Sequence, residues 1–240
     1  MSQRKKDFVT KEELMVGRTP QELVEWFDRK IQEITQQEGG KSAIRMREGY
    51  CKQLMEEIYP LSIFASWQFS DRNDVTLQPV IGSQNYDVLI TDCAFVPPHE
   101  SKLEITLALG DEYLKRFMIQ KEGWSPISGY IEKTGTKNTG IHLTPRLGVR
   151  GLEDYLDKQI NLIGQALEGK LQKEYETNTS LLIIFEDATA FDETDIKETL
   201  YRFIENKLET EQTRFLHLYL VSSPKRIFIK WTPNNTSHSY

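Results

Sequence analysis

The sequence predicts an α/β fold, in which a central mixed β-sheet is flanked by helices and preceded by an N-terminal helical arm. Three observations carry this prediction. Two apolar patterns at helical spacing come first, and three short alternating segments follow them. A continuous apolar run, LLIIF at 181–185, then lies between two further helical patterns. Such a run is typical of a central strand that is covered on both faces.

The first predicted helix begins at a capping box. Thr19 and Glu22 stand three residues apart, and a proline occupies the first turn between them. Apolar residues recur at helical spacing until the glycine pair at 39–40, which ends the helix. A second helix is expected at 42–59, and Pro60 is expected to end it.

Strands are predicted at 75–82 (VTLQPVIG) and 86–92 (YDVLITD), and a third lies within HESKLEITLALGDEY at 99–113. Side chains of a strand point alternately to its two faces. Leucine and isoleucine occupy one set of alternate positions in the third strand, so that face is apolar. The opposite face carries Lys102, Glu104 and Thr106.

The remaining elements are expected in this order: a helix at 111–121, a long loop or irregular hairpin at 123–151, a helix at 152–175, the strand at 181–185, a helix at 193–208 capped by Asp192, and two strands, FLHLYLVSS and RIFIKW. The chain is thus expected to comprise an N-terminal helical arm (1–41), an α/β domain (42–232) and a polar tail (233–240).

Composition excludes several classes of protein. The net charge of −6 argues against a histone-like or coating protein, which is usually basic. The two cysteines lack C-x-x-C partners, which excludes a disulfide scaffold or a cysteine zinc site and favours a reducing cytoplasm. No run is long enough to span a membrane, and the first residues lack the apolar core of a signal peptide.

Two carboxylates on neighbouring predicted strands indicate a metal site. Asp87 lies at the start of one strand and Glu104 within the next. Because paired strands lie about 4.8 Å apart, both carboxylates can reach one cation. Mg²⁺ and Mn²⁺ prefer such hard oxygen ligands. Lys102, on the same face as Glu104, could position a water that the metal activates.

This pattern resembles the PD-(D/E)XK superfamily of nucleases, which has the restriction-endonuclease-like fold. The resemblance covers residues 42–230 in element order, and it matches the metal-binding aspartate to Asp87 in NYDVLI and the second acid to Glu104 in KLEITLAL. The lysine position of the family falls on Thr106, which departs from the pattern, and Lys102 would replace it. Glu100 and Lys102 also spell E-x-K, but they lie at the edge of the strand, so Glu104 ranks higher.

Many members also carry an acid on the helix before the first strand. Glu48 is the preferred candidate, because Ile44, Cys51 and Met55 flank it at helical spacing. The acids at 56–57 lie further from this apolar pattern.

A basic segment is the candidate nucleic-acid contact. It contains four cations and no acid: Lys133, Lys137, Arg146 and Arg150. With Trp124 and Tyr130 beside it, such a segment could follow a phosphate backbone. The alternative is a solvated loop that happens to lack acids.

The expected function is that of an Mg²⁺- or Mn²⁺-dependent nuclease that hydrolyses phosphodiester bonds. The expected partner is nucleic acid, with DNA preferred over RNA. Restriction or defence against foreign DNA is implied by the resemblance alone. The alternative is a catalytically inactive module of the same fold that binds nucleic acid or a protein partner. A third interpretation is an α/β scaffold whose polar strand face is simply solvated. The arm before residue 40 could form a homodimer or cover the sheet.

Overall fold

The structure, a computed structural model, describes residues 7–110, 112–125, 130–136, 140–146, 151–186, 191–210, 213–223 and 226–233. Its centre is a six-stranded mixed sheet in the order β1-β2-β3-β6-β7-β8. These strands are β1 (Val75–Pro79), β2 (Val88–Asp92), β3 (His99–Ala108), β6 (Thr179–Glu186), β7 (Leu218–Ser223) and β8 (Phe228–Trp231). The first three strands are antiparallel, β3, β6 and β7 are parallel, and β8 runs antiparallel to β7.

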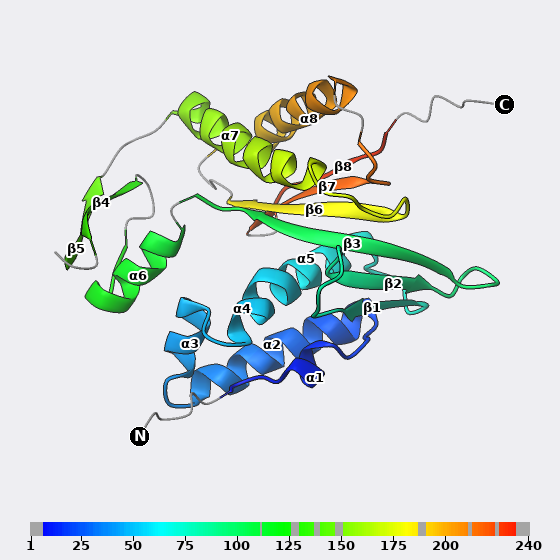
Figure 1. Cartoon of the computed structure of the whole chain (residues 1–240), viewed down its shortest axis with the longest axis horizontal. Helices are drawn as coiled ribbons and strands as arrows, with labels where there is room; N and C mark the ends of the chain where they lie inside the picture. Colours follow the sequence, from blue (N-terminus) through cyan, green and yellow to red (C-terminus); the bar gives the residue numbers. More distant parts are fainter. Residues whose placement is uncertain are drawn as a thin grey trace.

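Helices cover both faces of this sheet (Figure 1). The N-terminal elements lie on one face: α1 (Lys11–Leu14), α2 (Pro20–Gln36), α3 (Gly40–Met46), α4 (Cys51–Gln53), the π-helical segment η1 (Leu54–Ile58) and α5 (Tyr59–Gln68). The opposite face carries α7 (Leu152–Leu171) and α8 (Glu193–Thr210). The predicted α/β class with a mixed, helix-flanked sheet is confirmed.

The start of α2 confirms the predicted capping box. The backbone N–H of Glu22 donates to Thr19 Oγ1 over 3.4 Å, and the backbone N–H of Thr19 donates to Glu22 Oε2 over 2.9 Å. Leu23 and Ile34 of this helix are fully buried in the same cluster as Leu103 of β3. The N-terminal arm therefore forms part of the core of the sheet domain.

The predicted second helix, 42–59, is wrong in both its continuity and its end. The chain leaves α3 at Arg47, which has a left-handed backbone (φ 58°, ψ 46°), and becomes helical again at Cys51. Pro60 does not end the helix, which runs on to Gln68. The backbone N–H of Tyr59 donates to Leu54 five residues back, so a widened turn precedes the proline. Pro60 then occupies the first turn of α5, where its missing N–H costs little.

The pairing of β3 changes along its length. Its first half, up to Leu103, pairs with β2. From Lys102 to Ala108 it pairs with β6. In the part of the chain that the structure describes, no strand continues β2 along the second half of β3. This half of β3 therefore has one edge that is free for side chains to occupy.

Both faces of β3 are covered. Leu103 and Ile105 belong to the cluster under the N-terminal helices, whereas Ala108 belongs to the cluster under α7 and α8. Glu104 is only 7% exposed. The third interpretation, a solvated polar strand face, is therefore wrong at Glu104, because α7 packs over this part of the sheet.

Strand β6 confirms the prediction, made from its apolar run, of a central strand covered on both faces. The side chains of Leu181 to Phe185 are all buried, and they contribute alternately to the clusters on the two faces. The cap of α8 is also confirmed, since the backbone N–H of Thr194 donates to Asp192 Oδ1 over 2.8 Å. α7 ends at Leu171, four residues before the predicted end at 175.

The glycine-rich segment forms a hairpin rather than a long loop. α6 (Glu112–Glu122) precedes β4 (Tyr130–Thr136) and β5 (Gly140–Arg146), which pair with each other as a separate antiparallel sheet. The hairpin and α6 lie at one end of the molecule (Figure 1). Among the described residues, no helix has the length and apolar character needed to cross a membrane.

Candidate active site

Asp87 occupies the edge of β3 at the point where β2 begins. Its backbone N–H donates to the carbonyl of Leu103 over 2.9 Å. Its Oδ2 atom accepts the backbone N–H of Ile105 over 2.7 Å. The carboxylate thus satisfies a backbone donor that a neighbouring strand would otherwise satisfy. These two hydrogen bonds fix Asp87 beside the middle of β3.

Glu104 lies next to this point on β3 and is held from the side of α7. Lys170 Nζ, in the last turn of α7, contacts Glu104 Oε1. The hydroxyl of Tyr175 donates to the same oxygen over 3.4 Å. Burial, then the charge of Glu104, raises the pKa of Tyr175, so its hydroxyl keeps its proton. A buried carboxylate needs such partners, because an unpaired one is costly to desolvate.

A third carboxylate, Glu57 of η1, approaches the same place from the other face. Burial, followed by repulsion from Asp87, raises the pKa of Glu57 from 4.5 to about 7. Burial and then repulsion from Glu104 raise the pKa of Asp87 from 3.8 to about 6. Glu104 also raises the pKa of Glu57. These three residues therefore interact electrostatically, and we call them the acid cluster.

Three lysines oppose this accumulation of negative charge. Lys170 and Lys173 both lower the pKa of Asp87, although burial and Glu104 outweigh them. Lys52 does the same for Glu57. The site is thus a group of one buried and two half-buried carboxylates whose charge nearby ammonium groups neutralise only in part.

The chemistry of the acid cluster fits a divalent cation. Carboxylates that raise one another's pKa values are stabilised when a cation binds between them. Among the described residues, no group of three or more His, Cys, Asp or Glu side chains is arranged to hold a metal ion. Mg²⁺ commonly needs only one or two carboxylates, together with water and substrate oxygens. The residues present therefore fit a cation that two of these carboxylates would bind.

The predicted residues Asp87 and Glu104 interact as neighbours, but Lys102 has other contacts. Its Nζ contacts Glu176 Oε2 and lies 5.0 Å from the centre of the Tyr86 ring. Thr106 is half-buried on β3, two residues beyond Glu104. The lysine that contacts Glu104 is Lys170, 66 residues further along the chain.

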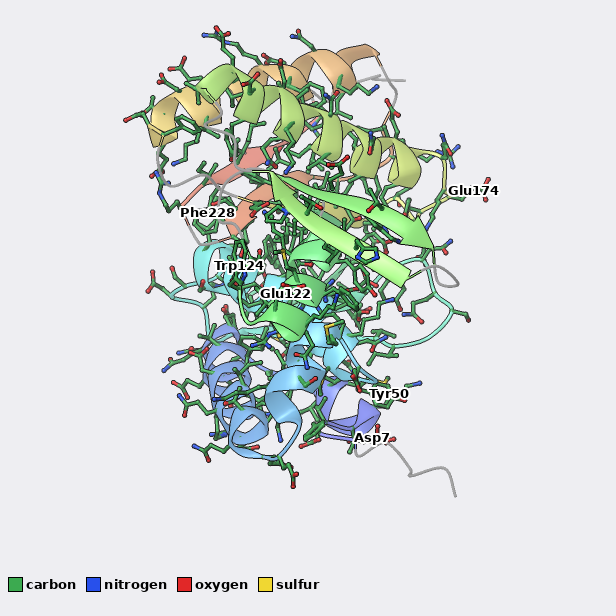
Figure 2. The ribbon with its side chains drawn as sticks, turned by 90° about the vertical axis from the view of Figure 1, so that its left-hand side faces the viewer. Asp7, Tyr50, Glu122, Trp124, Glu174 and Phe228 are labelled. Atoms are coloured by element: carbon green, nitrogen blue, oxygen red, sulfur yellow. The ribbon has the colours of Figure 1, made fainter. Side chains whose placement is uncertain are left out.

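The interpretation of Glu48 as a helical acid is wrong. Glu48 lies in the turn between α3 and α4 rather than on a helix. It lines a pocket of about 260 Å³ with Asp7 and Tyr50. Figure 2 shows Asp7 and Tyr50 close together at one end of the molecule, whereas Glu174 lies at its edge, away from them. Glu57 is the helical acid that reaches Asp87.

The helical spacing that favoured Glu48 assumed one regular helix. The left-handed residue at Arg47 and the wide turn of η1 both break this period. A period of 3.6 residues therefore assigns the wrong face to the residues that follow. The adjacent acids Glu56 and Glu57 were the available signal, but their spacing alone did not identify them.

The predicted basic segment is described only in part. Lys133 lies exposed on β4. Arg146 is the last residue of β5, but its side chain is outside the described set, and Lys137 and Arg150 lie outside the described residues altogether. The predicted contact of this segment with nucleic acid stays a prediction.

Comparisons of the chain with protein-family models, with curated proteins and with solved structures gave no match. The function is therefore inferred from the geometry and the charges of the site itself.

Proposed function

We propose that the protein is a metal-dependent nuclease that hydrolyses phosphodiester bonds, with DNA as its substrate. The observation that carries this proposal is the acid cluster. Three carboxylates from η1, the start of β2 and the middle of β3 interact, where Glu104 is buried and the other two are half-buried with strongly raised pKa values. Perturbed acids of this kind are typical of catalytic sites.

The order of elements also supports the proposal. A helix, a strand pair bearing Asp87 and the strand bearing Glu104 come first along the chain. The helix α6, the β4–β5 hairpin, the helix α7 and the buried strand β6 follow. This is the order on which the resemblance to PD-(D/E)XK nucleases rests. A role in restriction or defence belongs to the same proposal and has only that resemblance behind it.

In this proposal Asp87 and Glu104 hold Mg²⁺ or Mn²⁺, and the charge of Glu57 acts on the same site. When bound, the cation polarises the phosphate and lowers the pKa of a water molecule. Asp87 is oriented by the N–H of Ile105, so its free oxygen can act as a ligand. The raised pKa values of Asp87 and Glu57 mean that these two acids lose their protons near pH 6–7.

Lys170 is the proposed lysine of the site. Its ammonium group already lies against Glu104, where it can donate a hydrogen bond to an attacking water or to a phosphate oxygen. Lys102 was the expected lysine, but its contacts are with Glu176 and Tyr86. Thr106, the residue at the usual lysine position, is left with at most a hydrogen-bonding role.

The contacts of Glu104 favour one alternative function, a catalytically inactive module that binds nucleic acid or a protein partner. Lys170 and Tyr175 both engage Glu104 Oε1. An ammonium group at this oxygen neutralises the carboxylate without a metal. If Lys170 always occupied this position, no cation would bind to Glu104 and the protein would not cleave. The proposed location for either function is the cytoplasm, because Cys51 and Cys93 are both free thiols.

A cleavage assay with matched variants tests the proposal. Supercoiled plasmid, linear duplex and RNA are incubated with the protein in Mg²⁺, in Mn²⁺ and in chelator. We expect metal-dependent cleavage of DNA that Asp87→Asn and Glu104→Gln each reduce at least about 100-fold. Lys170→Ala should reduce it by about 100-fold, whereas Lys102→Ala stays within about threefold of the wild type.

Two results would overturn the proposal. Cleavage that continues undiminished in chelator would exclude the metal role. A folded wild-type protein that binds DNA but cleaves no substrate in either metal would establish the inactive module instead. Circular dichroism of each variant checks that the fold is retained.

A further inference from the structure

A pocket of about 410 Å³ lies beside the acid cluster. It is formed by the end of α7 with the residues that follow it, and by the segment before β7. Its lining residues are Lys170, Leu171, Gln172, Lys173, Glu174, Tyr175, Thr213, Arg214 and Phe215. Lys170 and Tyr175 both contact Glu104 as well. The pocket and the acid cluster therefore share a wall, and we call this cavity the basic pocket.

The lining of this pocket is cationic. Lys170, Lys173 and Arg214 outnumber its single acid, Glu174. Glu174 is exposed, and Figure 2 shows it at the outer edge of the molecule. Lysine and arginine are in the minority over the whole chain, 30 against 36 acidic residues, so this local excess runs against the composition. The pocket is therefore suited to an anion.

The position of these cations is only partly explained by the helix. Cations are favoured at the carbonyl end of a helix, which accounts for lysines near the end of α7. Arg214 comes from a different segment, and Lys170 Nζ is engaged with Glu104. Lys173 lowers the pKa of Asp87, so its charge also acts on the acid cluster. Cations from two segments thus surround one cavity next to the site.

The base of the pocket is formed by two packed aromatic side chains. The rings of Tyr175 and Phe215 lie with their centres 4.8 Å apart. Both side chains are buried, and Tyr175 is hydrogen-bonded to Glu104. Lys173 and Arg214 are exposed around this fixed base, so they can move to meet a ligand. The pocket therefore has buried aromatic side chains at its base and exposed cationic side chains at its opening.

We propose that the basic pocket binds a phosphate group of the nucleic-acid strand whose neighbouring phosphodiester lies at the acid cluster. This inference rests on the proposed function. A phosphate carries negative charge and accepts hydrogen bonds from both lysine and arginine. Lys170 lies between the two places, so it can contact the bound phosphate and the acid cluster together. The pocket would thereby set which bond of the strand reaches Asp87 and Glu104.

The phosphate can come from the end of a strand or from within it, and binding experiments distinguish the two. Fluorescence anisotropy of the full-length protein is measured in chelator, so that nothing is cleaved. The probes are oligonucleotides with a 5′-phosphate, a 3′-phosphate or hydroxyl ends, and a circular single strand. The variant is Lys173→Ala with Arg214→Ala. The matched control, Lys197→Ala with Arg202→Ala, removes the same charge from α8.

We expect the Lys173/Arg214 variant to bind about tenfold more weakly and to lower the salt slope of log Kobs by about 1–2. The α8 control should stay within about twofold of the wild type. A terminal phosphate is the source if the variant loses a preference for one phosphorylated end. An internal phosphate is the source if all probes, the circle included, weaken equally.

The inference is overturned if the variant and the α8 control bind every probe alike. If cleavage nevertheless persists, the proposed nuclease function stands without this pocket. Conversely, weakened binding in a protein that never cleaves would keep the pocket and reject the nuclease. Because Lys173 and Arg214 are exposed, both variants should keep the wild-type melting temperature, which is measured alongside.

Discussion

Lys170, in the last turn of α7, contacts Oε1 of Glu104, in the middle of β3. The two side chains are only 17% and 9% exposed, so their charges are largely removed from water. Breaking a buried pair is costly, because the remaining charge loses its partner. Substitutions at either residue should therefore affect both the stability of the protein and the activity of its proposed site.

Lys170→Met should lower the free energy of unfolding by about 3–5 kcal/mol, because it leaves Glu104 buried without its cation. The double variant Lys170→Met/Glu104→Gln should be less destabilised than the sum of the two single variants. Urea unfolding of the four proteins measures this coupling. Lys102→Met is the control and should cost less than about 1 kcal/mol, since its partner Glu176 is 67% exposed. Additive effects at Lys170 and Glu104 would contradict the pair.

Glu57→Gln should change how stability depends on pH. The pKa of Glu57 is about 7 in the folded protein and 4.5 as its ordinary value. The folded state therefore holds this proton more tightly, so stability is lost as the pH rises from 4.5 to 7. The variant escapes this loss and should exceed the wild type by on the order of 1–3 kcal/mol at pH 8. Urea unfolding at pH 4.5 and pH 8 measures the difference. An equal gain at both pH values, or the same gain in Glu48→Gln, would refute it.

Binding of Mn²⁺ alone should strengthen as the pH rises from about 5.5 to 7.5. Asp87 must lose its proton to act as a ligand, and Glu57 adds negative charge beside the cation when it loses its own proton. The raised pKa values of both acids fall in this window. Titration calorimetry in two buffers of different ionisation enthalpy measures both the affinity and the protons released. Asp87→Asn should weaken Mn²⁺ binding and reduce its pH dependence to the part contributed by Glu57. Affinity that stays constant across this range would argue against these ligands.

Glu57→Ala and Glu48→Ala should differ in their cleavage rates. Glu57 interacts with Asp87 and Glu104, so its loss should reduce cleavage at least about 100-fold. Glu48 lies in a turn beside Tyr50, and its loss should leave the rate within about threefold. Rates measured at saturating Mg²⁺ decide between them. The reverse order would contradict the assignment of Glu57 to the site and assign a catalytic role to Glu48.

The elements that could be predicted are those whose signal is local. The capping box of α2 and the apolar run of β6 each depend on neighbouring residues, and both are confirmed. Alternation in β3 also placed Glu104 correctly opposite Leu103 and Ile105. That Glu104 is buried did not follow from alternation, because α7 covers it from residues much later in the chain.

The parts that failed depend on contacts between distant residues or on irregular backbone. Lys170 reaches Glu104 across 66 residues, and no spacing rule predicts such a contact. Pro60 was expected to end a helix, but the wide turn before it allowed the helix to continue. The same irregularity left Glu48 in a turn and placed Glu57, not Glu48, where it interacts with Asp87.

The wide turn of η1 has a consequence for how this site could arise or disappear. A π-helical turn corresponds to one residue more than a regular helix would hold. Deleting one residue from Leu54–Ile58 would let the backbone return to a regular pitch and change the directions in which the side chains of this segment point. Glu57 would then turn away from Asp87 while the helix survived. A change of one codon in length, with no substitution at any acid, would be enough to dismantle the cluster.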